Sequence, residues 1–163
     1  MFTRELHDLA RETLELFRAR KAMLVTAESC TGGLIAGLLS EIPGSSDVLD
    51  RGFVTYSYAS KTDLLGVPAD LIRERGAVDP DVARAMAAGA LDRAPAATVA
   101  VAVTGVAGPG QSERKPAGLV FIAVARRGGA IRVEECRFAG DRTAVRLASV
   151  SRALAMAREA LAA

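Results

Sequence analysis

A cluster of small polar residues follows directly on a short apolar run near residue 25. Residues 26–31 read TAESCT, and a Gly-Gly pair and the apolar run LIAGLL come next. This order predicts a strand, a tight turn and a helix, with Ser29 in the turn. Free backbone N–H groups there could hold an anion or an oxyanion, and Gly32 and Gly33 would let a ligand approach the backbone. Ser29 is therefore a candidate nucleophile, although helix capping by Ser29 and Thr31 explains the same spacing equally well.

A serine nucleophile in this chain needs a base other than histidine. The only histidine, His7, lies in the first predicted helix, residues 3–20, far from the glycine-rich corners. A desolvated lysine can serve, because burial lowers a lysine pKa to about 7–8. The β-branched and aromatic run 51–58 predicts a second strand, and it brings Tyr56 and Lys61 to a second corner. Tyr56 would relay a proton or hold the amine; a strand tyrosine and a solvated lysine are the ordinary alternative.

Two further features of these corners have competing explanations. Cys30 could be a reactive thiol at a helix start, but a small buried filler is the favoured interpretation. A third corner, residues 104–110, reads TGVAGPG and could wrap a phosphate or a ribose. It lacks the Gly-Lys-Ser/Thr ending of a P-loop, so the glycines alone are a weak signal. Glu28 has no role that the sequence can defend.

Composition restricts the class of protein. The 163 residues are 50% hydrophobic and 25% charged, which predicts a single globular domain spanning residues 1–163. The 21 basic and 19 acidic residues are mixed along the chain, which argues against a nucleic-acid or membrane partner. No apolar run approaches the ~20 residues that a bilayer requires. The two cysteines have no metal or redox spacing, so we expect a cytoplasmic protein without a metal site.

The order of predicted elements indicates an α/β protein in which helices cover a mixed sheet. In such sheets ligands bind beyond the carboxyl ends of the strands, so the three corners are expected to meet. A last helix is expected to follow a cap at Asp141. The other predicted strands and helices are strand 23–26, helix 33–41, helix 60–65, helix 81–93, strand 98–103 and an antiparallel hairpin of 118–125 with 131–138.

Seven dispersed motifs together resemble one known family, the CinA C-terminal domain family. They are AESCTGG at 27–33, PGSS at 43–46, VTYS…K…LLGV at 54–67, GAV at 76–78, AVTGVAGPG at 102–110, KPAG at 115–118 and FAGDR at 138–142. The match covers nearly the whole chain in the family's order. The resemblance implies a three-layer α/β/α fold and a homodimer or larger assembly.

The activity that the resemblance implies is hydrolysis of the carboxamide of nicotinamide mononucleotide (NMN). The products are nicotinate mononucleotide and ammonia, in pyridine nucleotide salvage, with no cofactor. By position, Ser29 matches the family's proposed nucleophile, with Lys61 and Tyr56 as its partners. The substrate-binding candidates on matching stretches are Thr31, Gly32, Gly33, Ser46, Thr104, Gly105 and Arg142.

The chain departs from the family's pattern at one position of the second corner. Family members commonly read Tyr-Ser-Asn where this chain reads Tyr56-Ser57-Tyr58. Position 58 therefore supplies no amide. Two alternatives to the implied activity stay open: a nucleotide-binding module that grips a phosphate without catalysis, and an amidase acting on a different nucleotide or amide.

Overall fold

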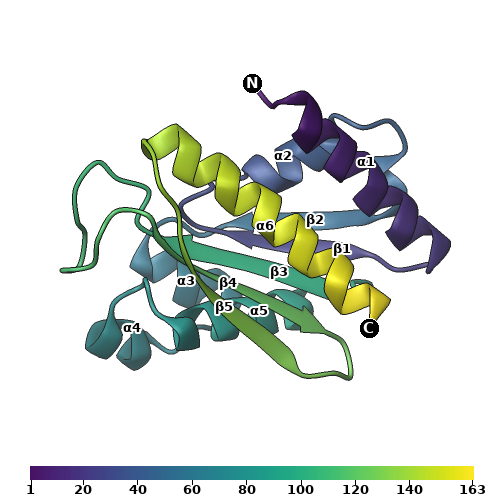
Figure 1. Cartoon of the computed structure of the whole chain (residues 1–163). Coiled ribbons are helices and arrows are strands. Elements are labelled where there is room, and N and C mark those ends of the chain that lie inside the picture. Colours follow the sequence, from purple (N-terminus) through teal and green to yellow (C-terminus); the bar gives the residue numbers. More distant parts are fainter.

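Five strands form one mixed sheet in the order β2-β1-β3-β4-β5 in the computed structural model, which describes residues 1–163 (Figure 1). β1 pairs in parallel with β2 and β3, while β4 is antiparallel to both β3 and β5. Only β4 therefore runs against the other strands, so the predicted mixed sheet with an antiparallel hairpin near its C-terminal end is confirmed. The strand bounds are Leu24–Glu28, Leu49–Val54, Val99–Gly105, Leu119–Arg126 and Ile131–Arg137 for β1 to β5.

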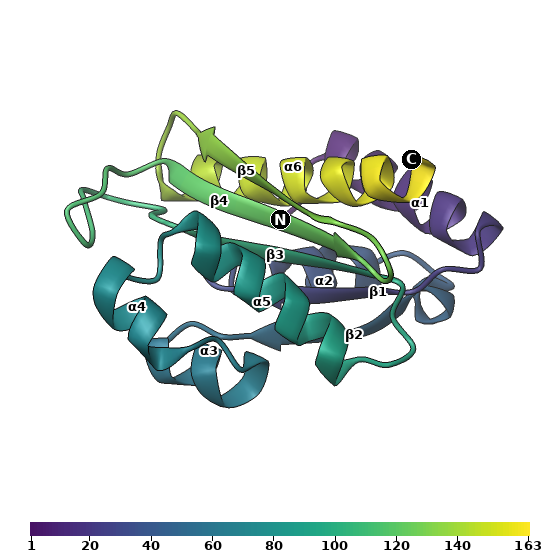
Figure 2. The same cartoon turned by 90° about the horizontal axis from the view of Figure 1, so that it is seen from below.

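Helices cover both faces of the sheet, which gives the three layers α/β/α (Figure 2). On one face lie α1 (Arg4–Ala19), α2 (Leu34–Ser40) and α6 (Arg142–Ala162). On the other lie α3 (Tyr58–Leu65), α4 (Ala69–Arg75) and α5 (Pro80–Arg93). None of these helices combines the length and the apolar character needed to cross a membrane.

The central strand β3 is buried on both faces, as its uninterrupted apolar sequence predicts. Val101 and Val103 face the α1–α2–α6 layer, whereas Ala100 and Ala102 face the layer that contains α5. The alanine-rich face keeps the α5 layer close to the sheet. Gly89 also lets α5 pack closely against the end of α3, because a Cβ at position 89 would lie 1.8 Å from the Leu65 carbonyl oxygen.

Two sequence predictions on the α3–α4 side were wrong. β2 ends at Val54 and α3 begins at Tyr58, so Tyr56 and Tyr58 are not strand residues. The Ser57 hydroxyl accepts a hydrogen bond from the Ser60 N–H at 3.1 Å, and this N-cap starts the helix two residues earlier than predicted. α4 was missed altogether, since its seven residues contain too few apolar positions to show a helical period.

Glu28 fixes the start of α2, which is the role that the sequence left open. Its side chain is fully buried and accepts the N–H groups of Ile35 at 2.9 Å and Ala36 at 3.1 Å. The Thr26 hydroxyl donates to the same carboxylate at 3.2 Å. The N-cap residue, Gly33, has no side chain to do this. The first N–H groups of α2 are therefore occupied by the protein's own carboxylate and are not free to bind an anion.

We expect Glu28→Ala to lower the free energy of unfolding by about 2–4 kcal/mol, because it leaves two buried N–H donors without acceptors. Chemical denaturation would measure the change. Glu15→Ala, at an exposed position of α1, is the matched control and should stay within about 0.5 kcal/mol of the wild type. Equal stabilities of the two variants would contradict the capping role.

Candidate active site

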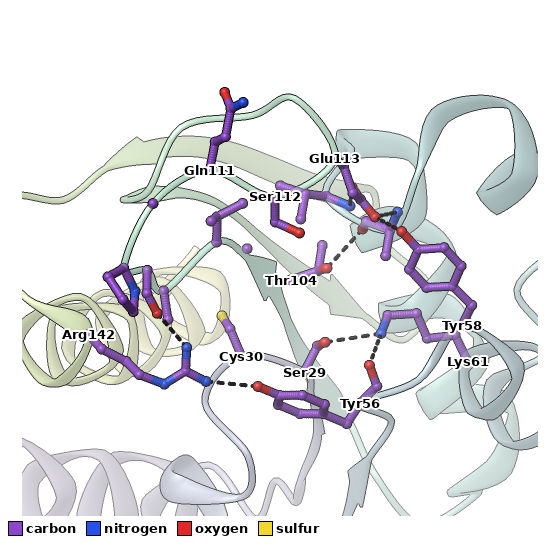
Figure 3. A pocket seen from close by; sticks show the side chains of 18 residues that line it. Ser29, Cys30, Tyr56, Tyr58, Lys61, Thr104, Gln111, Ser112, Glu113 and Arg142 are labelled. Atoms are coloured by element: carbon purple, nitrogen blue, oxygen red, sulfur yellow. Dashed lines mark hydrogen bonds between the residues drawn. The ribbon is translucent and has the colours of Figure 1, made fainter.

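A pocket of about 320 Å³ opens at the carboxyl ends of β1 and β3 (Figure 3). Its walls come from the ends of those strands, from the start of α3, from the loop that joins β3 to β4, and from the start of α6. The three corners singled out in the sequence thus meet, as the topology of an open α/β sheet predicts. The predicted residues that line it are Ser29, Cys30, Tyr56, Lys61, Thr104, Gly105 and Arg142.

Ser29 and Lys61 are in direct contact at the base of this pocket. The Lys61 Nζ lies 3.0 Å from the Ser29 Oγ in a buried hydrogen bond. The Ser29 N–H donates to the Val103 carbonyl at 3.0 Å, which ties the turn to β3. Lys61 is fully buried and Ser29 is only 8% exposed. The hydroxyl therefore has a fixed position and an amine within hydrogen-bonding distance.

The surroundings of the Lys61 amine suit its neutral form. Burial lowers the pKa of Lys61 from 10.5 to about 8. The amine also lies 2.6 Å from the Thr55 carbonyl oxygen and 3.4 Å from that of Tyr56. A neutral amine has two hydrogens and one lone pair. In the neutral form the two carbonyls can accept both hydrogens, which leaves the lone pair for the hydroxyl proton of Ser29; in the charged form the third hydrogen is donated to the Ser29 Oγ.

Tyr56 holds the amine through its backbone carbonyl, not through its phenol. The phenol oxygen accepts a hydrogen bond from Arg142 Nη2 at 2.9 Å, at the mouth of the pocket. Arg142 Nη1 donates at 2.6 Å to the carbonyl of Gly108 in the β3–β4 loop. Arg142 thus joins the start of α6 to two walls of the pocket, which it also lines.

Cys30 lines the pocket but has the properties of a buried filler. Burial raises the pKa of its thiol to about 11, so the thiol is neutral near pH 7. A neutral thiol is a poor nucleophile. Between the two adjacent candidates, the hydroxyl of Ser29 is the one with a base beside it.

Two other predicted binding residues on the pocket wall have clear structural tasks. The Thr104 hydroxyl donates to the Ala77 carbonyl at 2.8 Å and leaves only its lone pairs for a ligand. Gly105 has no room for a side chain, since a Cβ would lie 2.7 Å from Val120 Cγ2 and 2.8 Å from the Leu119 carbonyl oxygen. Both residues therefore shape the pocket through the path of the backbone.

The remaining predicted binding residues do not line this pocket. Thr31 is fully buried and its hydroxyl has no hydrogen-bond partner. Gly32 and Gly33 have φ values of +58° and +95°, which explains the two glycines by the turn itself. Ser46 lies in the short 3₁₀ helix Ser45–Asp47 before β2, at the opposite end of the sheet from Ser29. The structure does not bring these residues to the cavity of their own chain.

Glu113 is a pocket residue that the sequence did not single out. It lies in a tight turn at φ +54° and accepts the N–H groups of Ala77 at 2.8 Å and Val78 at 3.0 Å. The Tyr58 hydroxyl donates to the same carboxylate. Burial alone would raise the pKa of Glu113, but these hydrogen bonds outweigh it and keep the pKa below its usual value. Tyr58, the departure from the family's pattern, therefore anchors the β3–β4 loop to α3.

Arg146 was also missed, although it stands one turn after Arg142 on α6. Its Nε donates to the Cys30 carbonyl at 3.0 Å and its Nη2 to the Thr31 carbonyl at 3.3 Å. The four-residue spacing from Arg142 places both side chains on one face of the helix. That spacing could have indicated a second arginine near the site. The atoms that Arg146 contacts are backbone carbonyls, which no residue type in the sequence identifies.

Fold and pocket together define a class: a three-layer α/β/α protein with a buried serine–lysine pair at the carboxyl edge of a mixed sheet. The family model of the CinA C-terminal domain matches residues 6–161. The chain belongs to the CinA C-terminal domain family, as its motifs indicated.

Similar proteins agree with this assignment. The chain is 45% identical over 152 residues to the nicotinamide-nucleotide amidohydrolase PncC of Escherichia coli K12, covering 92% of this chain and 91% of that protein. It is 46% identical over 148 residues to the protein of the same name from Enterobacter agglomerans. The crystal structure of the competence/damage inducible protein CihA from Agrobacterium tumefaciens superposes with a TM-score of 0.94 at 48% identity, covering 100% of this chain and 99% of that one.

Other relatives are much longer than this chain. A CinA-like protein of Geobacter sulfurreducens is 49% identical over 147 residues, which are 90% of this chain but 35% of that protein. The chain thus spans about a third of the length of several curated relatives that it matches.

We expect Glu113→Ala to speed amide hydrogen exchange at Ala77 and Val78 by at least about tenfold, because both N–H groups lose their acceptor. Exchange followed by NMR would measure it. Tyr58→Phe is the matched variant: it removes one donor but keeps the carboxylate, so the two amides should stay protected. Unchanged exchange in Glu113→Ala would show that the loop is held by other contacts.

Burial of Lys61 also predicts a pH-dependent stability. The pKa is about 8 in the folded state and close to 10.5 in the unfolded state, so the unfolded state binds more protons between these values. The free energy of unfolding should therefore rise with pH between about 8 and 10.5. The rise should be about 2–3 kcal/mol larger in the wild type than in Lys61→Met. Denaturant unfolding of both proteins from pH 7 to 10.5 would measure the difference. Parallel pH curves would contradict the lowered pKa.

Proposed function

We propose that the protein hydrolyses the carboxamide of NMN to nicotinate mononucleotide and ammonia, with Ser29 as nucleophile and Lys61 as base. The observation that carries the proposal is the buried 3.0 Å contact between the Lys61 amine and the Ser29 hydroxyl. Two relatives that match this chain over 90% and 91% of their own length are named nicotinamide-nucleotide amidohydrolases, which supports the choice of substrate.

The reaction divides into two acyl-transfer steps. Neutral Lys61 takes the proton of Ser29 while the serine oxygen bonds to the carboxamide carbon, and the carbonyl oxygen becomes an oxyanion. When the C–N bond breaks, the proton on Lys61 passes to the leaving ammonia and an ester remains on Ser29. Water then attacks the ester with Lys61 again accepting a proton, and the acid is released as Ser29 regains its hydrogen.

The turn after Ser29 supplies a donor for the oxyanion. The N–H groups of Cys30 and Thr31 donate to no backbone carbonyl, whereas the Gly32 N–H is already bonded to the Ser29 carbonyl at 3.0 Å. One oxyanion donor typically contributes ~3–4 kcal/mol of barrier lowering. The residue after a serine nucleophile is a usual source of such a donor. We assign this task to the Cys30 N–H, because Cys30 lines the pocket and Thr31 does not.

The charges at the pocket mouth suit a nucleotide monophosphate. Arg142 would contact the phosphate, because a guanidinium binds phosphate oxygens in a bidentate manner. Thr104, Gly105 and the loop after them would enclose the ribose and the ring. The proposal includes a role in pyridine nucleotide salvage, a cytoplasmic location, and a homodimer or larger homo-oligomer, as the family resemblance implies.

The test is ammonia release from NMN by the wild type, Ser29→Ala and Lys61→Met. We expect the wild type to release ammonia and both variants to lose at least ~10³-fold in kcat. Arg158→Gln, on the far part of α6, is the matched control and should keep full activity. Near wild-type rates in Ser29→Ala would overturn the assignment of the nucleophile.

The main alternative is a nucleotide-binding module without catalysis. It would bind NMN in a calorimetric titration, release no ammonia, and bind equally well after Ser29→Ala. An amidase for another nucleotide or amide would instead release ammonia from a different member of a substrate panel. The same assay on that panel therefore separates the three functions.

The pH dependence of kcat/KM gives an independent prediction. Only neutral Lys61 can act as base, so with a pKa of about 8 the rate should rise about tenfold per pH unit below 8 and level off above it. Initial rates from pH 6 to 9.5 would record the profile. A flat profile through pH 8 would contradict lysine as the base.

A further inference from the structure

We propose that Arg146 is a positioning residue that polarises the oxyanion donor of the nucleophile turn, the Cys30 N–H. This inference rests on the proposed serine acyl transfer and adds a residue to it. The guanidinium does not line the pocket and does not contact Ser29. It acts through the peptide groups between the two.

The contacts of Arg146 are with the carbonyls of the turn alone. Its Nε donates to the Cys30 carbonyl at 3.0 Å and its Nη2 to the Thr31 carbonyl at 3.3 Å. In a trans peptide the C=O and the N–H point in opposite directions. Each carbonyl that turns toward Arg146 therefore turns the N–H of the following residue away from it. The N–H groups affected are those of Thr31 and Gly32.

One of these peptides carries an N–H without a backbone acceptor. The Cys30 carbonyl belongs to the same peptide as the Thr31 N–H, which donates to no backbone carbonyl. A carbonyl that accepts a charged donor polarises its amide, and the N–H at the other end becomes a stronger donor.

The second peptide leads to a free donor in two steps. The Thr31 carbonyl shares its peptide with the Gly32 N–H, which donates to the Ser29 carbonyl at 3.0 Å. The Ser29 carbonyl in turn shares its peptide with the Cys30 N–H, the donor next to the nucleophile. A continuous chain of hydrogen bonds thus runs from the guanidinium to the oxyanion position.

Two features of the surroundings favour this role over simple capping. The α2 N–H groups at 35 and 36 are held by Glu28, so Arg146 is not needed to fix the helix start. The guanidinium is also not paired with a carboxylate, and its hydrogen bonds go to these two carbonyls. Arg146 therefore places a permanent positive charge next to the peptide groups of the turn.

The test compares Arg146→Gln and Arg146→Lys with the wild type in ammonia release from NMN. We expect Arg146→Gln to lower kcat about 10- to 50-fold with KM changed less than about twofold, because the loss falls on the transition state. Arg146→Lys retains a positive charge, so its decrease in log kcat should be at most about two thirds of the decrease in Arg146→Gln. Arg158→Gln, which pairs only with Glu12, is the control with unchanged kcat.

The pH profile separates polarisation from a structural role. If Arg146 only holds the turn in place, its loss would displace Ser29 from Lys61. The rising limb of the pH–rate profile, which levels off near pH 8, would then shift, and KM would rise. The proposal predicts that the limb stays in place while kcat falls. Equal kcat in Arg146→Gln and wild type, or a shifted limb with raised KM, would overturn it.

A second acyl donor makes the result independent of the natural amide. Acylation of Ser29 by p-nitrophenyl acetate releases p-nitrophenolate and needs the same oxyanion donor. Arg146→Gln should slow this acylation by a similar factor. If the wild type is acylated but releases no ammonia from NMN, the proposed substrate is wrong and the inference is still decided by the acylation rates. If acylation of the wild type does not occur at Ser29, both fail.

Discussion

The burial of the Lys61 amine is the constraint on which the rest of the site depends. Burying a charged amine costs free energy, so burial favours the neutral form of Lys61. Only a neutral amine can take the proton of Ser29. The carbonyls of Thr55 and Tyr56 satisfy its hydrogens. In the proposed mechanism Lys61 takes the place of the histidine that serine hydrolases commonly use. Its position is set by α3, whose start is fixed by the Ser57 cap.

The other contacts around the pocket serve to keep the backbone of two corners in place. Glu28 holds the start of α2, and Arg146 holds the carbonyls of the turn after Ser29. Glu113 ties the β3–β4 loop to residues 77 and 78, and Arg142 ties it to the start of α6. The reacting groups need fixed geometry because a small displacement raises the barrier steeply. Most charged side chains around this site therefore form hydrogen bonds with backbone carbonyls and N–H groups.

Much of this arrangement could be predicted from the sequence, and the parts that could not be predicted fall into two groups. The apolar period of α1 and the continuous apolar run of β3 specify the layers, and the strand-end motifs specify Ser29 and Lys61. The start of α3 and the existence of α4 depend on a local cap and on packing, which a short segment does not encode in its period. The tasks of Glu28, Glu113 and Arg146 involve backbone atoms of distant segments. Such partners have no residue type, so no motif identifies them.

The pKa of Lys61 tests the central claim most directly. It can be measured by labelling lysine with ¹³C at the ε carbon and following the Lys61 resonance from pH 6 to 12, with Lys61→Met to assign the signal. The account predicts a midpoint near pH 8, where burial holds the amine. A midpoint close to 10.5, the ordinary value of a solvated lysine, would leave almost no neutral amine near pH 7 and would contradict Lys61 as the base for Ser29.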